Sequence, residues 1–339
     1  FPNWSRSIYK NDRPLRNSTV TTIAPTGCVA AETRIATAGG LLSIRQMGDP
    51  TGERWQPIDV IVCTDTGKKA ATQFYVNGRS PVITVRTTHG YFLTATPNHK
   101  IRAIDRDGEY TWRRMDAIQI GDAVVLQREF LPHSVPVFLD GEPPAHGNEK
   151  PISLPGRLTP ELCEFLGIYF GDGCTKEKGL SITFDERDLD TAEHVRVLVK
   201  SLFGLETGAV EHYDGCFALT VHSTRLVKWL DRNGLLKPHS SEIRVPEKIF
   251  QADRECVKAF LRGLFTADGA VSRKQGTLTL ASVSEAFIDA VQLLLLGVGV
   301  VCKKDVSTNR RSAKGNLPLH RLTVLGRTAF AEISFLPGR

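Results

Sequence analysis

The sequence lacks any apolar run long enough to cross a membrane. Its longest candidate, AVQLLLLGVGVVC, is well short of the ~20 apolar residues that a membrane helix requires. The first residues, FPNWSRSIYKNDRPLRN, have neither the apolar core nor the small-residue cleavage site of a secretory signal peptide. We therefore expect no membrane partner.

Paired cysteines are also missing. The seven cysteines are scattered between positions 28 and 302 and show no C-x-x-C or other metal-binding spacing. An odd, scattered set is typical of packed thiols in a reducing compartment, so we expect a cytoplasmic protein. The net charge of +6 permits a polyanionic partner but does not identify one.

Residues 28–128 consist of short alternating apolar runs broken by turns, which predicts an all-β domain. Turn signals at TGKK, NGRS and THGY predict hairpins. The stretch LPHSVPVFLDGEPPAHGNEKPISLPG is rich in proline and predicts a linker, which we assign to residues 129–157.

An internal repeat follows the linker. LCEFLGIYFGDGC (162–174) recurs about 96 positions later as VKAFLRGLFTADGA (257–270). In each copy a helix-like run ends in Asp-Gly and is followed by strand-like text and an amphipathic helix. The sequence therefore predicts two α+β repeats, residues 158–250 and 251–339, that form a pseudo-dimer within one chain.

Small residues four positions apart on one helix face allow two helices to pack closely. These residues are Gly167 with Gly171, and Gly263 with Ala267. If the helices cross there, Asp172 and Asp268 meet at the C-terminal ends, where the carboxylates repel each other and the helix dipoles. Mg²⁺ would remove this penalty, and paired carboxylates with metal ions hydrolyse phosphodiesters. A single Asp-Gly would more simply indicate a helix cap or a turn, but the matched second copy favours a metal site.

These motifs resemble those of the two-motif, single-chain LAGLIDADG homing endonucleases, over about residues 157–336. The resemblance implies two αββαββα repeats astride a long DNA site, with Asp172 and Asp268 as Mg²⁺ ligands. It also implies a basic residue ahead of a P-x-x-I pattern. In EIRVPEKIF, Arg244 and Lys248 are both candidates for that role.

The segment CKKDVSTNRRSAKGNLPLHRLTV has the charge of a β-hairpin that neutralises DNA phosphates. Its basic residues are Lys303, Lys304, Arg310, Arg311, Lys314 and Arg321. Without the two motifs, a solvated loop would be an equally good interpretation. The first repeat offers a poorer surface, because Lys176 and Lys178 are followed by the acidic FDERDLD.

Residues 28–128 resemble the front half of an intein splicing domain of the Hint type. The blocks CVAAETRIATAGGLLSIRQM, GYFLTATPNHKI and WRRMDAIQIGDAVVL match that family in order, and TPNH has its Thr-x-x-His spacing. The resemblance implies an N-to-S acyl shift in which the Cys28 thiol attacks the carbonyl of Gly27. His99 is expected to protonate the leaving nitrogen, and Thr96 to hold the scissile carbonyl.

Residues 1–27 are interpreted as a host flank. RNSTVTTIAPTG resembles a segment of adenosylcobalamin-dependent (class II) ribonucleotide reductases, which implies that the cobalamin belongs to the parent reductase alone. The expected DNA target is then double-stranded DNA of the uninterrupted host gene. No C-terminal His-Asn is present, so we expect a truncated intein, in preference to a natural split or a separate domain, whose partners are its C-terminal segment and C-extein. A DNA-binding module without cleavage and a reductase fragment are the alternatives.

Overall fold

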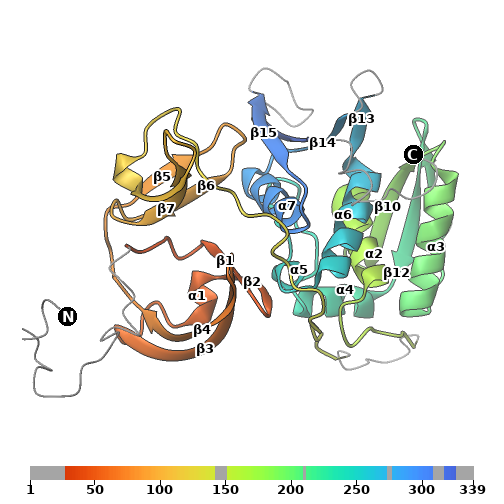
Figure 1. The fold of residues 1–339 in the computed structure, drawn as a ribbon. Coiled ribbons are helices and arrows are strands. Elements are labelled where there is room, and N and C mark those ends of the chain that lie inside the picture. Colours follow the sequence, from red (N-terminus) through yellow and green to blue (C-terminus); the bar gives the residue numbers. More distant parts are fainter. Residues whose placement is uncertain (1–26, 142–150, 209–210, 273–276, 308–316, 326–339) are drawn as a thin grey trace, which may run out of the picture.

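The computed structural model describes residues 27–141, 151–208, 211–272, 277–307 and 317–325 (Figure 1). Within these ranges, no helix combines the length and apolar character needed to cross a membrane. The chain forms a β-rich unit followed by a larger unit of helices and sheets (Figure 1).

The first unit is built from antiparallel strands. Its four-stranded sheet has the order β2-β1-β3-β4, and two separate hairpins pair β5 with β6 and β7 with β8. The strands are β1 Arg34–Thr37, β2 Gly40–Ser43, β3 Trp55–Thr64, β4 Gly67–Tyr75, β5 Ile83–Arg86, β6 Phe92–Ala95, β7 Lys100–Ile104 and β8 Tyr110–Arg114. The short helices α1 (Ile44–Met47) and η2 (Met115–Ala117) complete it. The prediction of a β-rich unit is confirmed.

Two of the three predicted turns join paired strands. TGKK lies at the β3–β4 turn and THGY at the β5–β6 turn, with Gly67 at φ +105° and Gly90 at φ +92°. NGRS connects β4 to β5, which belong to different sheets, so this hairpin prediction was wrong. The left-handed Gly78 (φ +72°) bends the chain there but does not determine which strand the next one pairs with.

The second unit contains the two predicted repeats. The first is α2 Pro160–Asp172, β9 Gly173–Lys176, β10 Gly179–Asp185, α3 Leu189–Phe203, β11 Glu211–Tyr213, β12 Cys216–His222 and α4 Thr224–Arg232. After α5 Glu247–Phe250, the second is α6 Arg254–Asp268, β13 Ala270–Ser272, β14 Thr277–Ser282, α7 Glu285–Gly297, β15 Cys302–Ser307 and β16 Leu319–Val324. The first repeat has the predicted αββαββα order, and the second follows it as far as β16.

Each repeat forms an antiparallel sheet, in the orders β11-β12-β10-β9 and β13-β14-β16-β15. The helices α2 and α6 lie together between the two sheets (Figure 1). Strand alternation turns one face of each sheet toward the helices, where Leu180, Ile182, Leu278 and Leu280 are buried. The core of the second unit therefore surrounds the Asp-Gly helices.

The segment expected as a linker, residues 129–157, packs against the second unit where the structure describes it. Leu131 and Leu139 are buried in that unit's core. The backbone N–H of Glu129 donates to the Leu296 carbonyl at 3.1 Å. These contacts place the segment on the second unit rather than between two independent bodies.

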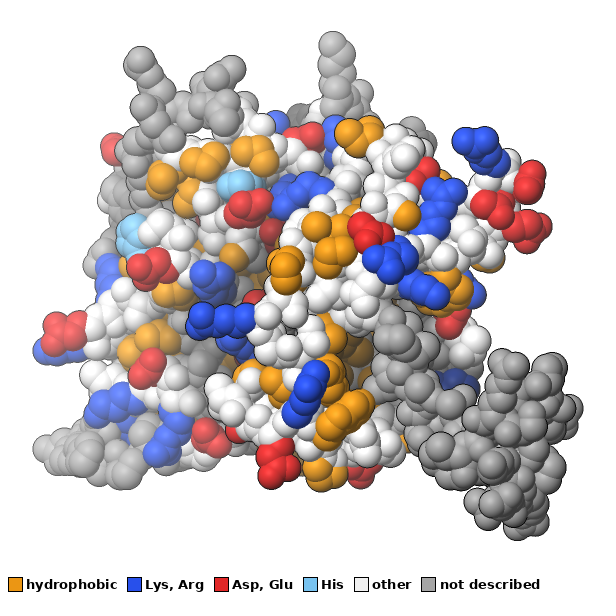
Figure 2. Space-filling model, turned by 90° about the vertical axis from the view of Figure 1, so that its left-hand side faces the viewer, with side chains coloured by type: hydrophobic (Ala, Val, Ile, Leu, Met, Phe, Trp, Pro, Cys, Tyr) orange, Lys and Arg blue, Asp and Glu red, His pale blue; other side chains and the backbone are white. Residues whose placement is uncertain are grey.

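Figure 2 shows the face of the molecule formed by the first unit, where apolar side chains lie among lysines and arginines. Tyr110 and Trp112 on β8 are 66% and 61% exposed. The Arg102 guanidinium lies 5.2 and 5.4 Å from the centres of these two rings, within cation–π range.

Candidate functional site

The two Asp-Gly helices, α2 and α6, cross at their glycines. A Cβ on Gly167 would overlap the carbonyl oxygen of Phe260, and one on Gly263 would overlap that of Glu164. Only glycine leaves the backbones room to touch at these positions. The predicted close crossing is confirmed.

One turn after the crossing, the helices end side by side. Gly171 of α2 lies against the Cβ of Ala267 in α6, and a Cβ on it would be 3.4 Å from the backbone nitrogen of Asp268. Asp172 is the last residue of α2, and Asp268 is the last residue of α6. Asp172 is half-buried and Asp268 is exposed. The crossing therefore brings together the two chain segments that carry these carboxylates.

The glycine after each aspartate is required by space. The N–H groups of Gly173 and Gly269 donate to the carbonyls of Tyr169 and Phe265, closing the last helical turns. A Cβ on either glycine would overlap the carbonyl oxygen that it bonds. Glycine therefore lets each chain leave the helix directly after its aspartate.

Lys237 lies at the end of α2, and the sequence analysis missed it. Its ammonium donates to the Gly171 carbonyl at 2.6 Å, beside Asp172. Its backbone is held on both sides, because its N–H donates to the Tyr169 hydroxyl at 3.1 Å and its carbonyl accepts from the Thr175 hydroxyl at 2.8 Å. A cation there is favoured by the negative end of the helix dipole. Lys237 follows α4, far from the motif, and no local pattern marks it.

The donors at these helix ends suit a hard cation. Asp172 and Asp268 bring two carboxylates to these ends, where the Tyr169, Gly171 and Phe265 carbonyls already accept hydrogen bonds. Mg²⁺ takes few protein oxygens and keeps waters and substrate phosphates as its other ligands, so two carboxylates are enough to hold it. In the part of the chain that the structure describes, no three His, Cys, Asp or Glu residues gather as a metal site.

The predicted DNA-contacting lysines of β15 point to opposite faces of the sheet. Lys303 is exposed, and its ammonium lies 2.9 Å from Asp305. Asp305 pairs in register with Arg321 of β16, which puts Arg321 on the same outer face. Lys304 is a correction to the prediction. Its side chain is 3% exposed and donates to Glu285 of α7 at 2.9 Å, because alternate strand residues face the core.

The remaining predicted DNA contacts are distributed differently. Arg244 is exposed, whereas the Lys248 ammonium donates to the Phe138 carbonyl at 3.0 Å and is held on the scaffold. Arg310, Arg311 and Lys314 lie outside the described residues.

At the other candidate site, both ends of the Gly27–Cys28 peptide are hydrogen-bonded. The Cys28 N–H donates to the Thr96 hydroxyl at 2.9 Å, and Nδ1 of His99 lies 3.2 Å from the Gly27 carbonyl oxygen. The expected partners are thus exchanged: Thr96 contacts the scissile nitrogen, and His99 the scissile carbonyl. The cause is the chain path, because the Thr96 N–H also donates to the Cys28 carbonyl at 2.8 Å and sets Thr96 beside the downstream residue.

Gly27 is the residue that this geometry demands. Its φ is +79°, and a Cβ would lie 2.5 Å from the backbone nitrogen of His99 and 2.6 Å from the Thr96 hydroxyl oxygen. Burial raises the pKa of the Cys28 thiol above its ordinary value, so this thiol forms its nucleophilic thiolate less readily than a free cysteine does.

Comparison with curated proteins finds relatives of broad functional range. The chain is 30% identical over 250 residues to the ribonucleoside-diphosphate reductase NrdEB subunit alpha of Bacillus subtilis, covering 68% of this chain. It is 28% identical over 308 residues to the replicative DNA helicase DnaB of a Nostoc species, covering 86% of this chain. The chain spans only 21% of that reductase and 31% of that helicase.

A solved structure of I-DmoI in complex with DNA and calcium aligns with 51% of this chain and 86% of its own, at 17% identity and a TM-score of 0.37. The family model described as the LAGLIDADG-like domain matches residues 255–333. This range covers the second repeat from α6 onward. Residues 255–333 of the chain are thus similar to the LAGLIDADG-like domain.

Proposed function

We propose that the second unit is a DNA endonuclease that hydrolyses phosphodiesters with a divalent metal. The observation that carries this proposal is the crossing of α2 and α6, which ends both helices side by side at Asp172 and Asp268. The match of residues 255–333 to the LAGLIDADG-like domain supports it.

In this proposal each residue has a separate task. Asp172 and Asp268 hold Mg²⁺, which when bound neutralises charge on the phosphate and lowers the pKa of water. The Lys237 ammonium, beside Asp172, adds positive charge where a phosphate would approach. Lys303 and Arg321, on the outer face of the β15–β16 pair, contact the DNA backbone.

The test is cleavage of a plasmid that carries the uninterrupted host-gene segment, incubated with the full chain and Mg²⁺. We expect a double-strand cut that EDTA and the Asp268→Asn variant both abolish. Retarded but uncut DNA would instead support a DNA-binding module without cleavage. Uncut and unretarded DNA would contradict the proposal for this target.

A second function, the acyl shift that begins protein splicing, is favoured by a separate observation. The carbonyl oxygen and the amide nitrogen of the Gly27–Cys28 peptide are already hydrogen-bonded, the oxygen to His99 and the nitrogen to Thr96. We therefore propose that residues 28–128 are the front part of an intein splicing domain.

The chemistry follows from these contacts. The Cys28 sulfur attacks the Gly27 carbonyl carbon, a C–S bond forms, and the C–N bond to the Cys28 nitrogen breaks. The thiol proton ends on that nitrogen, which becomes an amine. A His99 tautomer with hydrogen on Nδ1 donates to the carbonyl oxygen as negative charge develops there. The Thr96 hydroxyl accepts from the Cys28 N–H and so orients the peptide.

Intact mass measurement tests the acyl shift. With a small external thiol, transfer of the thioester releases residues 1–27, and we expect this loss in the parent chain but not in Cys28→Ala. Because burial raises the pKa of the thiol, the rate should still be rising with pH above the ordinary cysteine pKa. An unchanged mass at every pH would contradict the proposal for this chain.

The wider context is also proposed. Residues 1–27 are the flank of a ribonucleotide reductase host, from the resemblance of RNSTVTTIAPTG to the cobalamin-dependent class. The target DNA is then the uninterrupted gene around the Gly27 codon. Completion of splicing is assigned to a C-terminal intein segment, in the cytoplasm of the host cell.

A further inference from the structure

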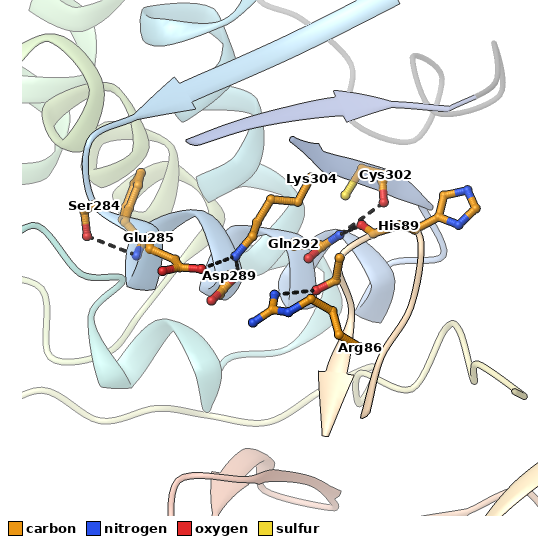
Figure 3. Close-up of polar contacts among 10 residues, drawn as sticks. Arg86, His89, Ser284, Glu285, Asp289, Gln292, Cys302 and Lys304 are labelled. Carbon is orange, nitrogen blue, oxygen red and sulfur yellow. Dashed lines mark hydrogen bonds and ion pairs between the residues drawn. The ribbon is translucent and has the colours of Figure 1, made fainter. Parts of the chain in front are cut away.

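The turn between β5 and β6 of the first unit is held by the second repeat of the nuclease unit (Figure 3). The His89 carbonyl accepts two hydrogen bonds across the interface, from the Lys304 backbone N–H at 3.0 Å and from Gln292 Nε2 at 2.8 Å. Lys304 belongs to β15, the edge strand of its sheet. The turn therefore satisfies one backbone N–H on the edge of β15 that would otherwise lack a strand partner.

The contacts that hold this turn, which we call the clasp, join His89, Gly90 and Tyr91 to Gln292, Cys302 and Lys304. They are buried and mostly polar. Gln292 of α7 is 2% exposed, and its Nε2 also donates to the Cys302 carbonyl at 3.2 Å. The Cys302 N–H donates in turn to the Tyr91 hydroxyl at 3.2 Å. Gly90 packs so closely that a Cβ on it would lie 2.7 Å from the Cβ of Lys304. Three consecutive residues, 89–91, thus contact the nuclease unit through directional bonds or close packing.

The strand that leaves this clasp runs directly to the scissile peptide. β6 begins after Tyr91 and ends at Ala95, which is fully buried and bridges to Val29. The next residue is Thr96, whose hydroxyl accepts from the Cys28 N–H. At about 3.4 Å per residue, the clasp and the Thr96 hydroxyl are separated by roughly 17 Å of extended chain.

The strand that follows the nucleophile in the chain, β1, is anchored to the same unit. Arg34 of β1 lies shortly after Cys28 and makes a two-point ion pair with Glu247 of α5, at 2.8 and 2.7 Å. Its guanidinium also stacks on the Phe250 ring, 3.4 Å from the ring centre. Both chain segments that meet at the scissile peptide are therefore fastened to the nuclease unit at a short distance along the chain.

We propose that the nuclease unit positions the splicing site: Gln292, Cys302 and Lys304 hold the His89–Tyr91 turn, and β6 thereby sets Thr96 against the Cys28 amide. This inference rests on the proposed acyl shift. Gln292 and Tyr91 are positioning residues in it, since they act through β6 and touch no reacting atom. A displacement of about 1 Å in a reacting group can slow a reaction up to ~100-fold, so a distant clasp suffices for a large effect.

The experiment compares three variants of the full chain in thiol-induced release of residues 1–27. Gln292→Met removes the amide donor to His89, and Tyr91→Phe removes the acceptor of the Cys302 N–H. Ser284→Ala is the matched control, because Ser284 caps the same helix α7 without touching the turn. We expect the first two to slow release by about 10-fold or more, and the control to release at the parent rate.

A spectroscopic measurement separates positioning from general loss of stability. In chains labelled with ¹⁵N-cysteine, the amide signal of Cys28 is identified by its disappearance in Cys28→Ala. We expect Gln292→Met to shift this signal and to speed its exchange with solvent, and we expect the same of Thr96→Ala, which removes the acceptor itself. The signals of Cys163 and Cys216, elsewhere in the fold, should stay in place.

The outcomes are distinguishable. Parent-like release and an unmoved Cys28 signal in Gln292→Met would overturn the positioning role while leaving the acyl shift intact. Equal slowing by Ser284→Ala would also overturn it, because stability alone would then explain the effect. If the parent chain releases nothing, the acyl shift fails, and the Cys28 signal still decides whether the clasp positions Thr96.

Discussion

The two repeats of the second unit share their central contacts and differ in the side chains around them. At the crossing, each helix presents a glycine to a backbone carbonyl of the other, Gly167 to Phe260 and Gly263 to Glu164. In frame with Phe260, however, the first repeat has Glu164, a buried carboxylate that contacts Arg262 and, at 2.5 Å, His194. A symmetric backbone contact therefore tolerates asymmetric side chains, because glycine makes the contact without them.

The outer faces of the two sheets differ as well. The second repeat presents Lys303, Asp305 and Arg321 there, whereas the first presents Lys176 and Asp185 beside the buried Ser181 and Thr220. The second repeat also carries the contacts to the β5–β6 turn. The two repeats are thus alike at the helix crossing, where close packing requires glycine in both. They differ in the side chains on their sheets and in their contacts with the first unit.

The largest effect should come from the symmetric centre. Asp172→Asn and Asp268→Asn each remove one carboxylate from the paired helix ends, and each should reduce double-strand cleavage at least ~100-fold, since metal ligands are lost. Rates on the same plasmid in Mg²⁺ measure this. If one variant loses cleavage while the other retains it, the two aspartates do not contribute equally, and the two repeats are not equivalent at their helix ends.

The buried carboxylate of the first repeat gives the next largest effect. Glu164→Ala leaves the Arg262 guanidinium without its partner and should lower the free energy of unfolding by about 3 kcal/mol. The double change Glu164→Leu with Arg262→Leu removes both charges and should be nearly neutral. Urea denaturation of the three chains measures this. A double variant as unstable as the single one would show that the charges are required.

The next prediction concerns Lys237, which contacts the end of α2, the Asp-Gly helix of the first repeat. Lys237→Met removes the ammonium from the Gly171 carbonyl and should slow cleavage about 10-fold, without a comparable loss of DNA binding. Single-turnover cleavage and gel retardation, measured side by side, separate the two effects. Cleavage at the parent rate would assign Lys237 to holding the chain after α4 instead.

The smallest effect concerns the charged face of the second repeat. Lys303→Ala should reduce the slope of log affinity against log salt by about 1, because one phosphate contact is lost. Lys304→Met, the buried neighbour, should leave that slope unchanged. Fluorescence anisotropy over a salt series measures both. Equal slopes for the parent and Lys303→Ala chains would remove this face from the DNA contact surface.

Much of the fold could be predicted from local patterns. The Asp-Gly runs predict α2 and α6, and the strand-like and amphipathic text predicts β10, β14, α3 and α7. These predictions succeed because hydrophobic period and helix ends are read over a few residues. The hairpin expected at NGRS failed because strand pairing is settled by the sheet, not by the turn alone.

The sites were predictable only in part. Cys28, Thr96 and His99 do lie together, but which of the last two contacts the nitrogen depended on how Thr96 N–H bonds to the Cys28 carbonyl. Lys304 looked equivalent to Lys303 in the sequence because a run of charges does not reveal its register. The segment 129–157 looked like a linker because its proline content hides the buried Leu131 and Leu139.

By itself, then, the sequence determined the order of elements, the paired Asp-Gly ends and the glycines that permit close packing. These depend on spacing and on the presence or absence of a Cβ, which are local properties. Tertiary structure alone decided that Lys237 donates a hydrogen bond to the end of α2, that Lys304 is buried, and that Gln292 donates to the His89 carbonyl. Such contacts join residues far apart in the chain, so they exist only once the packing of whole elements has set the distances.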